Sequence, residues 1–357
     1  MKSNAPTMKD VAREAGVALG TVSKVFNGIP VGESYRLRVE KAAAALGYQV
    51  NQYARGLRAD RTYTVAVILP SVNHPFFAAL AQHLCAALAQ QGRRMLLYLS
   101  AYRPDLEQEC VNMVRQNKVD GVIALTYNPI KIDRNLPFIS IDRCLNAEIP
   151  CVSADNYGGG RLAAEKLLER GCTHLAFIRT GSAHASETDK RGDGFEMACR
   201  VRGVPYDTLR LNDEDNPALL EDFLRAHLRD GRMELDGIFC STDLLAWRIG
   251  KLLGQFGVRV PQEVQLIGFD GIQRFGGEEF YCSTIVQPVQ KMAETCVELL
   301  LDQNRSNMPA LICLPVSYAA GGTTKEPDGT EQGSGDRAKG SDNGVEQPRG
   351  AAETAER

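Results

Sequence analysis

From residue 64 onward, the chain alternates between short, unbroken apolar runs and longer segments with apolar positions at helical spacing. The run TVAVILP at 64–70 is typical of a strand buried on both faces, and the amphipathic segment 76–92 predicts a helix that Gly92 ends. Further strands are predicted at 95–100, 121–125, 138–141, 175–178, 237–240, 265–268 and 283–286. Further helices are predicted at 105–117, 157–170, 188–202, 217–228, 243–256 and 289–302.

This alternation predicts an α/β core with parallel sheets and helices on both of their faces. About ten strands are expected over this region, and they are better divided between two lobes than held in one sheet. Ligands of such folds bind beyond the carboxyl ends of the strands. A cleft between the two lobes is therefore the expected place for a small molecule.

A different pattern precedes the core. Met8, Val11, Ala12 and Ala15 recur at helical spacing after Thr7, which can cap a helix, and Gly16 ends the run. A second helix is predicted at 18–26, and two short helices joined by a tight turn form a helix-turn-helix, whose second helix lies in the DNA major groove. Six residues stay outside its apolar stripe and can face DNA: Leu19, Gly20, Thr21, Ser23, Lys24 and Asn27. An ordinary helical hairpin is the alternative on these residues alone.

A third helix is predicted at 33–46, ended by Gly47, which completes a headpiece over residues 1–49. Residues 50–61 hold too few apolar side chains for an independent helix and look by themselves like a flexible linker. Residues 325–357 contain one large aliphatic residue, so they predict a disordered tail without a leucine heptad.

Charge is distributed unevenly along the chain. The formal net charge is −3, but residues 1–61 hold ten basic and five acidic residues, as a nucleic-acid-binding domain needs. The ten cysteines form no CxxC pair, so neither a metal site nor a disulfide framework is expected. No apolar run approaches the ~18 residues of a membrane span, and no leader is evident, so a cytoplasmic protein without membrane contact is expected.

Residues 7 to about 324 resemble the LacI/GalR family of bacterial transcriptional regulators. The headpiece motifs are DVAREAGV, TVSKVFNG, RVEKAAAALGY and YARGL. The core motifs, in order, are NHPFF, VDGVIAL, DNYGGGRLAAEKLLERG, RGDGF, STDLLA, GVRVPQEVQLIGFDG and STIVQPV. The resemblance implies a periplasmic-binding-protein-like core at 62–324. Lobe one is then about 63–155 with 288–314, and lobe two about 156–284 with 315–324.

The resemblance also implies how DNA is bound. Leu19 and Lys24 are expected at base edges and Thr21, Ser23 and Asn27 at phosphates, with Thr7 and Gly20 among the DNA-binding positions. Residues 50–61 become a hinge that folds on double-stranded operator DNA and pairs with its dimer mate. Within the hinge, Leu57 is expected to wedge into the minor groove, beside Asn51 and Ala54. A homodimer on a pseudo-palindrome follows, and the absence of a heptad argues against a tetramer.

For the effector, the resemblance implies a pocket between the lobes. Its expected residues are Asn73, Phe76, Asp142, Arg191, Phe239, Thr242, Asp270 and Gln287. Asp142, Asp270 and Arg191 suit the hydroxyls of a small polyhydroxylated ligand, with Phe76 or Phe239 as a flat apolar wall. A sugar or sugar derivative is therefore favoured over a purine.

Several positions depart from the family pattern. Ala18 stands where a capping serine is usual, and Val50 stands where a proline usually precedes the hinge. Glu187 stands where small hydroxyl residues are common, which suggests an unusual effector.

Two other classes stay open at this point. A solute-binding protein shares the two-lobed core but would need export. An enzyme on the same fold is the third class, with Asp243 and Asp270 as a possible carboxylate pair. Neither a GxGxxG loop nor a GxSxG elbow is present, so catalytic residues and a cofactor are not expected.

Overall fold

The structure is a computed structural model that describes residues 6–48, 62–133, 135–181, 184–212, 218–274, 279–302, 304 and 308–327. The predicted hinge at 50–61, with Asn51, Ala54 and Leu57, lies outside the described residues. So does the predicted tail beyond residue 327.

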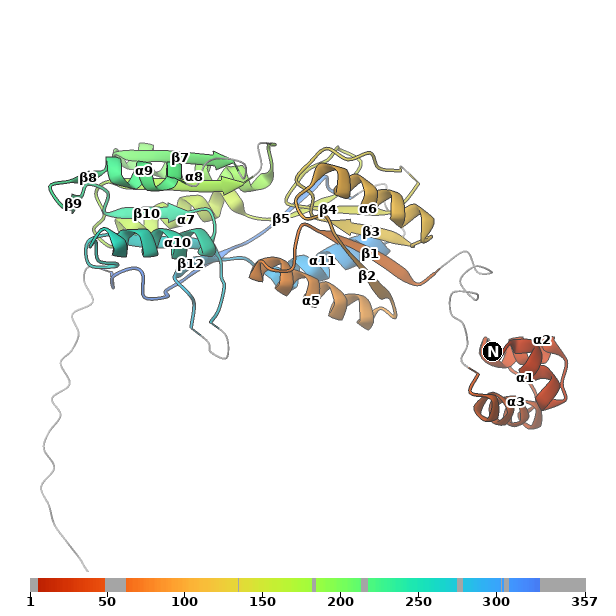
Figure 1. Ribbon diagram of the computed structural model, residues 1–357. Coiled ribbons are helices and arrows are strands. Elements are labelled where there is room, and N and C mark those ends of the chain that lie inside the picture. The colour runs from red at the N-terminus through yellow and green to blue at the C-terminus, as the bar shows by residue number, and fades with distance from the viewer. Residues whose placement is uncertain are drawn as a thin grey trace, which may run out of the picture.

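Three helices form the headpiece, at the red end of the chain in Figure 1: α1 (Met8–Ala15), α2 (Leu19–Phe26) and α3 (Glu33–Leu46). The Thr7 hydroxyl oxygen accepts a hydrogen bond from the Asp10 N–H, and the Asp10 carboxylate accepts one from the Thr7 N–H (2.9 Å). This reciprocal cap starts α1, and Gly16 ends it in the left-handed conformation at φ +60°. The predicted helix-turn-helix is confirmed. Ala18 provides α2 with no side-chain cap, as its sequence suggested.

The first sheet of the core has the strand order β13-β5-β4-β3-β1-β2, and all of its pairs are parallel. Its strands are β1 (Thr64–Leu69), β2 (Arg94–Leu99), β3 (Gly121–Ala124), β4 (Phe138–Ile141), β5 (Cys151–Ala154) and β13 (Leu311–Leu314). Its helices are α5 (Pro75–Gln90), α6 (Pro104–Gln116) and α11 (Val289–Leu301).

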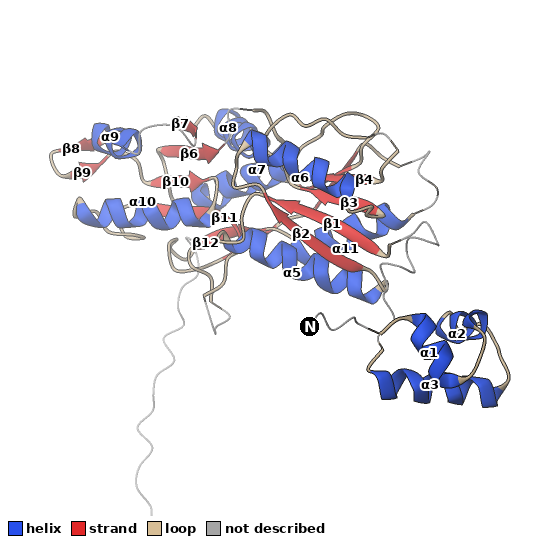
Figure 2. Ribbon diagram, turned by 45° about the vertical axis from the view of Figure 1, so that its right-hand side comes forward, coloured by secondary structure: helices blue, strands red, loops and turns tan. Residues whose placement is uncertain are grey.

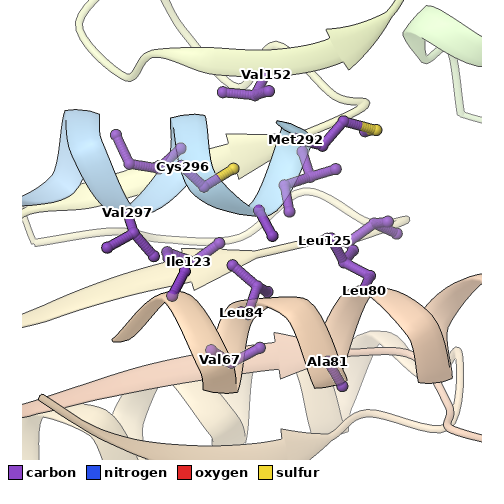
Figure 3. Close-up of a cluster of buried hydrophobic side chains, with 14 of the residues drawn as sticks. Val67, Leu80, Ala81, Leu84, Ile123, Leu125, Val152, Met292, Cys296 and Val297 are labelled. Carbon is purple, nitrogen blue, oxygen red and sulfur yellow. The ribbon is translucent and has the colours of Figure 1, made fainter. Parts of the chain in front are cut away.

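The two faces of β1 show why its sequence is an unbroken apolar run. Val65, Val67 and Leu69 lie in one apolar cluster with side chains of α5 and α11, and Figure 3 shows Val67 in this cluster near Leu84 of α5. Ala66 and Ile68 point the other way and pack with α6. Since side chains alternate along a strand, a strand covered on both faces must be apolar at every position.

The second sheet has the order β14-β12-β11-β10-β6-β7, parallel except for β12 with β14. Its strands are β6 (Leu175–Gly181), β7 (Tyr206–Asn212), β10 (Gly237–Cys240), β11 (Gln265–Asp270), β12 (Ser283–Val286) and β14 (Ser317–Ala319). Its helices are α7 (Asn156–Leu168), α8 (Lys190–Arg202), α9 (Ala218–Ala226) and α10 (Asp243–Gln255), and a 3₁₀ turn, Glu187–Asp189, precedes α8. A small hairpin of β8 (Leu228–Arg229) and β9 (Arg232–Met233) follows α9. Helices flank the strands of both sheets in Figure 2.

The chain passes between the two sheets at Asp155, at Gln287–Pro288 and at Pro315–Val316. The predicted two-lobed α/β core with parallel sheets is thus confirmed. Among the described residues, β5, β7, β13, β14 and the β8–β9 hairpin were not predicted. No helix in the described part of the chain is long and apolar enough to cross a membrane.

Close packing of α7 against α8 depends on glycine. A Cβ at Gly160 would overlap the backbone carbonyl oxygen of Arg191, and one at Gly194 would overlap that of Tyr157. The two helix backbones therefore approach closely at both crossings. This contact fixes the start of α8, on which Arg191 lies.

Gly160→Ala should lower the midpoint of thermal unfolding by several degrees, because overpacking of this kind costs about 1–3 kcal/mol. Gly254→Ala is the matched control, since a Cβ at Gly254 in α10 meets no atom within 4 Å. The control should be neutral or stabilising by up to about 1 kcal/mol, as alanine is the better helix former. Equal losses of both variants in calorimetry would contradict the close approach.

Candidate functional site

A cavity of about 560 Å³ lies at the carboxyl ends of strands from both sheets. On the side of the first sheet it is lined by residues that follow β1, β2, β3 and β4, and on the side of the second by residues that follow β6, β10, β11 and β12. Its walls combine aromatic rings with charged groups, and the aromatic side chains are Phe76, Phe77, Tyr102 and Tyr127. Such a mixture is typical of a small-molecule site.

The centre of the charged wall is Arg191, which is only 4% exposed. Its Nε donates to Asn156 Oδ1 (2.7 Å), and its Nη1 donates to the Ser241 carbonyl oxygen (2.6 Å). The guanidinium lies over the Phe269 ring, 3.6 Å from its centroid. Arg191 is thus held on a fixed platform by hydrogen bonds and a cation–π contact.

Two buried carboxylates accompany Arg191, one from each lobe. Asp142 follows β4, and its Oδ1 accepts from Ser153 Oγ (2.7 Å). Asp270 ends β11, and its Oδ1 accepts from Gln287 Nε2 (2.8 Å). Burial raises the pKa of both carboxyls, and the positive charge of Arg191 opposes that rise.

Two buried acceptor atoms of this wall have no hydrogen-bond partner within the described part of the chain: Asp270 Oδ2 and Gln287 Oε1. Buried polar atoms are almost always paired, so two unpaired acceptors in cavity-lining residues make this wall a candidate for binding hydrogen-bond donors. The backbone is strained here as well, since Asp142 and Asp270 have φ of +57° and +128°. Strain of this kind concentrates at binding sites.

His74 closes one side of the cavity at the start of α5. Its Nδ1 accepts from the Phe76 N–H (3.3 Å), so the Nε2–H points toward Asp270 Oδ2, 3.9 Å away. Burial, helped by the nearby charge of Arg191, lowers the pKa of His74 to about 4. The ring is therefore neutral at physiological pH and serves as a donor on the acidic side of the cavity.

Six of the eight residues predicted for the pocket line this cavity: Phe76, Asp142, Arg191, Thr242, Asp270 and Gln287. Phe239 does not, because it is fully buried among Phe177 and Phe195, with ring centroids 5.2 and 5.7 Å away. Its expected role as an apolar wall is wrong. Asn73 is exposed and does not line the cavity.

The tyrosines and several basic residues of the cavity were not predicted from the sequence. Tyr102 and Tyr127 follow β2 and β3 in loops without a recognisable motif. Arg143, Arg179, His184 and Arg248 also line it. Glu187, which suggested an unusual effector, does not line the cavity. Its N–H instead donates to the Asp142 carbonyl oxygen (2.9 Å), which joins the two lobes.

The possible carboxylate pair of an enzyme is not formed as a reactive site. Asp243 Oδ1 accepts from Thr284 Oγ1 (2.6 Å) and Oδ2 accepts from the Ile272 N–H (2.7 Å). Asp243 is 1% exposed and does not line the cavity. Its contacts tie α10 to the loop after β11, which is a structural role.

The headpiece presents the other candidate surface. Leu19 is 43% exposed, and Gly20, Lys24 and Asn27 are exposed on the same helix, while Val22 is fully buried beneath them. Thr21 and Ser23 are half-buried. Thr7 is exposed and caps α1. The structure therefore brings the predicted DNA-reading residues of α2 to the surface of a folded three-helix unit.

Comparison with known proteins identifies both regions. Residues 7–51 match the model described as bacterial regulatory proteins, lacI family, and residues 62–299 match periplasmic binding proteins and sugar binding domain of LacI family. The molecule is a DNA-binding headpiece joined to a ligand-binding core. The chain belongs to the LacI family of transcriptional regulators.

Individual relatives agree with this assignment. The sucrose operon repressor of Streptococcus mutans is 32% identical over 320 residues, covering 88% of this chain and 98% of the relative. A LacI transcriptional regulator from Alkaliphilus metalliredigens, solved with D-xylulofuranose, is 26% identical with a TM-score of 0.63 and covers 74% of this chain and 99% of its own. The lac repressor dimer bound to operator and the anti-inducer ONPF shares the fold, with 20% identity, a TM-score of 0.74 and coverage of 90% and 99%.

Acid should destabilise the wild-type core relative to a His74→Asn variant. An unfolded histidine takes up a proton near pH ~6.5, whereas folded His74 does so only near about 4. Above the pKa of the unfolded histidine, neither the folded nor the unfolded protein holds this proton. As the pH falls between the two pKa values, only the unfolded state takes up the proton, so the folded state loses stability. Asparagine keeps an acceptor for the helix cap.

Asp142 and Asp270 shift in the opposite direction, so the informative quantity is the difference between the two proteins. In urea denaturation, the free energy of unfolding of the wild type should fall relative to that of the variant as the pH is lowered from about 7.5 to about 5. A difference in unfolding free energy that does not change with pH would show that His74 does not cause the pH dependence.

Proposed function

We propose that this chain is a transcriptional repressor that binds a pseudo-palindromic operator as a homodimer, with an affinity set by a carbohydrate between its lobes. The observation that carries the proposal is the union of two sites in one chain. One is a helix with exposed reading residues, and the other is a cavity with buried charges and unpaired acceptors. The names of the relatives, a bound sugar in one and an operator-bound dimer in another, support the same combination.

On the DNA, Leu19 and Lys24 of α2 contact base edges, and Gly20 allows close approach. Thr21, Ser23 and Asn27 contact phosphates, a role that agrees with the Asn27 Nδ2 to Ser23 Oγ contact (3.3 Å), which orients both side chains. The hinge at 50–61 folds on the operator, where Leu57 enters the minor groove beside Asn51 and Ala54. A dimer is expected rather than a tetramer.

In the core, the effector lies between lobe one (about 63–155 with 288–314) and lobe two (about 156–284 with 315–324). Asp270 Oδ2 and Gln287 Oε1 accept hydrogen bonds from its hydroxyls, while Arg191 donates to its oxygens. The rings of Phe76 and Tyr102 form the flat walls that suit a sugar. A sugar fits this set better than a purine because the unpaired buried atoms are acceptors in need of several donors.

The chain acts by binding and carries out no reaction in this proposal. Asp243 is saturated by structural hydrogen bonds, and the buried groups of the cavity serve recognition. We assign the protein to the cytoplasm, where its DNA target is, without a cofactor.

Asp270→Asn should abolish the effector response while operator binding without effector survives. The amide keeps an oxygen for Gln287 but replaces the unpaired Oδ2 acceptor with a donor. Loss of a hydrogen bond to a charged group costs about 1.5–3 kcal/mol, so carbohydrate affinity should fall by roughly tenfold or more. Calorimetry measures ligand binding, and fluorescence anisotropy on an operator fragment measures its release.

The matched control is Asp193→Asn, which changes an exposed carboxylate that does not line the cavity. The control should respond to the carbohydrate like the wild type. An Asp270→Asn protein that releases the operator at the wild-type ligand concentration would show that Asp270 is not in the effector site.

Lys24→Ala should relax the base preference at one position of each operator half-site. A lysine that reads a guanine discriminates by about 1–3 kcal/mol, whereas a phosphate contact weakens binding to all sequences equally. Binding-site selection measures the preference, and Lys41→Ala, an exposed lysine on α3, is the control. An unchanged consensus sequence with Lys24→Ala would show that Lys24 contacts the DNA backbone and not a base.

A further inference from the structure

The cavity contains more positive charge than recognition of a neutral sugar requires. Four arginines line it, Arg143, Arg179, Arg191 and Arg248, against the two carboxylates Asp142 and Asp270. Desolvated charges are costly unless they are matched, so the partners of each arginine decide which of them is open to a ligand.

The partners of these arginines differ. The negative charges of Asp142 and Asp270 act on Arg191, and Arg179 forms an ion pair with Asp189. Arg143, by contrast, has a buried Nη1 without a hydrogen-bond partner among the described residues.

The acid that acts on Arg143 is Glu107, and both of its carboxylate oxygens already accept backbone N–H groups, from Tyr127 and Asn128 (2.9 Å each). Glu107 is also fully buried. Arg143 is therefore a half-buried cation at the cavity wall, and its Nη1 has no hydrogen-bond partner in the described part of the chain.

The sheet order separates the two kinds of group. The unpaired acceptors are Asp270 Oδ2, on the last residue of β11, and Gln287 Oε1, on the residue after β12. Arg179 lies near the end of β6. Three strand spacings separate β12 from β6, which is roughly 14 Å. Arg143 lies on the β6 side of the cavity. The residue before it, Asp142, accepts a hydrogen bond at its carbonyl oxygen from the N–H of Glu187, in the segment after β6.

We propose that the effector is an anionic carbohydrate, a sugar phosphate or a sugar carboxylate, whose anion binds Arg143 with Arg179 and Arg248. This inference rests on the proposed function and names the chemical class of its ligand. Hydroxyl groups at the opposite end of the ligand satisfy Asp270 and Gln287. A guanidinium presents two parallel N–H groups, the geometry that both phosphate and carboxylate oxygens accept.

The placement of the arginines also gives the anion a role in control. Arg143 comes from the first lobe, and Arg179 and Arg248 come from the second. An anion between them binds best when the lobes hold these cations together. A ligand with such a preference for one lobe arrangement shifts the equilibrium between arrangements, whereas a ligand without one does not.

The test compares matched sugars by thermal shift and calorimetry. The probes are D-glucose with D-glucose 6-phosphate and D-glucuronate, D-fructose with D-fructose 6-phosphate, and inorganic phosphate alone. At least one anionic sugar should bind about tenfold more tightly than its neutral parent, and added salt should reduce this ratio. The phosphate and carboxylate members show which anion is preferred.

Arg143→Gln should bring the ratio of the two affinities to within about twofold of one. Arg143→Lys should keep part of the preference, since the charge stays but the fork is lost. Arg225→Gln removes an exposed arginine that pairs with Glu221 on α9 and does not line the cavity, so it should keep the wild-type ratio. Arg248→Gln, at an exposed position, serves as the second variant should Arg143→Gln fail to fold.

A neutral parent that binds as tightly as its anionic partners would overturn the inference and leave the proposed function intact. The same holds if the preference survives both Arg143→Gln and Arg248→Gln. If no sugar, charged or neutral, raises the melting temperature, the carbohydrate effector itself is wrong and this inference fails with it.

Discussion

The buried charge of Arg191 is the constraint on which the arrangement of the core depends. A guanidinium that is 4% exposed is stable only with its full set of partners, and these come from Asn156, Ser241 and the face of Phe269. The glycine crossing of α7 and α8 brings the start of α8 to the place where these contacts are made. Removing Asn156 or the Phe269 ring would leave part of a buried guanidinium without its contacts, so the ligand site depends on how the helices pack.

This charge also joins the lobes. Asp142 follows β4 of one sheet and Asp270 ends β11 of the other, and the charges of both act on Arg191. A change in the lobe arrangement must therefore change the electrostatics of the cavity. A ligand that satisfies acceptors on one lobe and cations on both will favour one arrangement, which is the physical content of control by an effector.

Much of this was predictable from the sequence because the relevant signals are local. Thr7, Asp10 and Gly16 specify the ends of α1 by hydrogen bonding and backbone conformation, and unbroken apolar runs mark strands buried on both faces. Strands β5 and β13 were missed because they pair with each other across more than 150 positions, a contact that no local pattern marks. Phe239 was misplaced since the direction of a side chain on a strand depends on register, which one apolar run does not define.

One coupling free energy links ligand binding in the cavity to operator binding by the headpiece. The most direct test measures four dissociation constants with the full chain: operator without and with a saturating carbohydrate, and the carbohydrate without and with operator. The account predicts that the carbohydrate changes operator affinity by the same factor, about 5- to 150-fold, by which the operator changes carbohydrate affinity. A carbohydrate that binds the cavity tightly while both factors equal one would contradict the account, because the cavity and headpiece would then act independently.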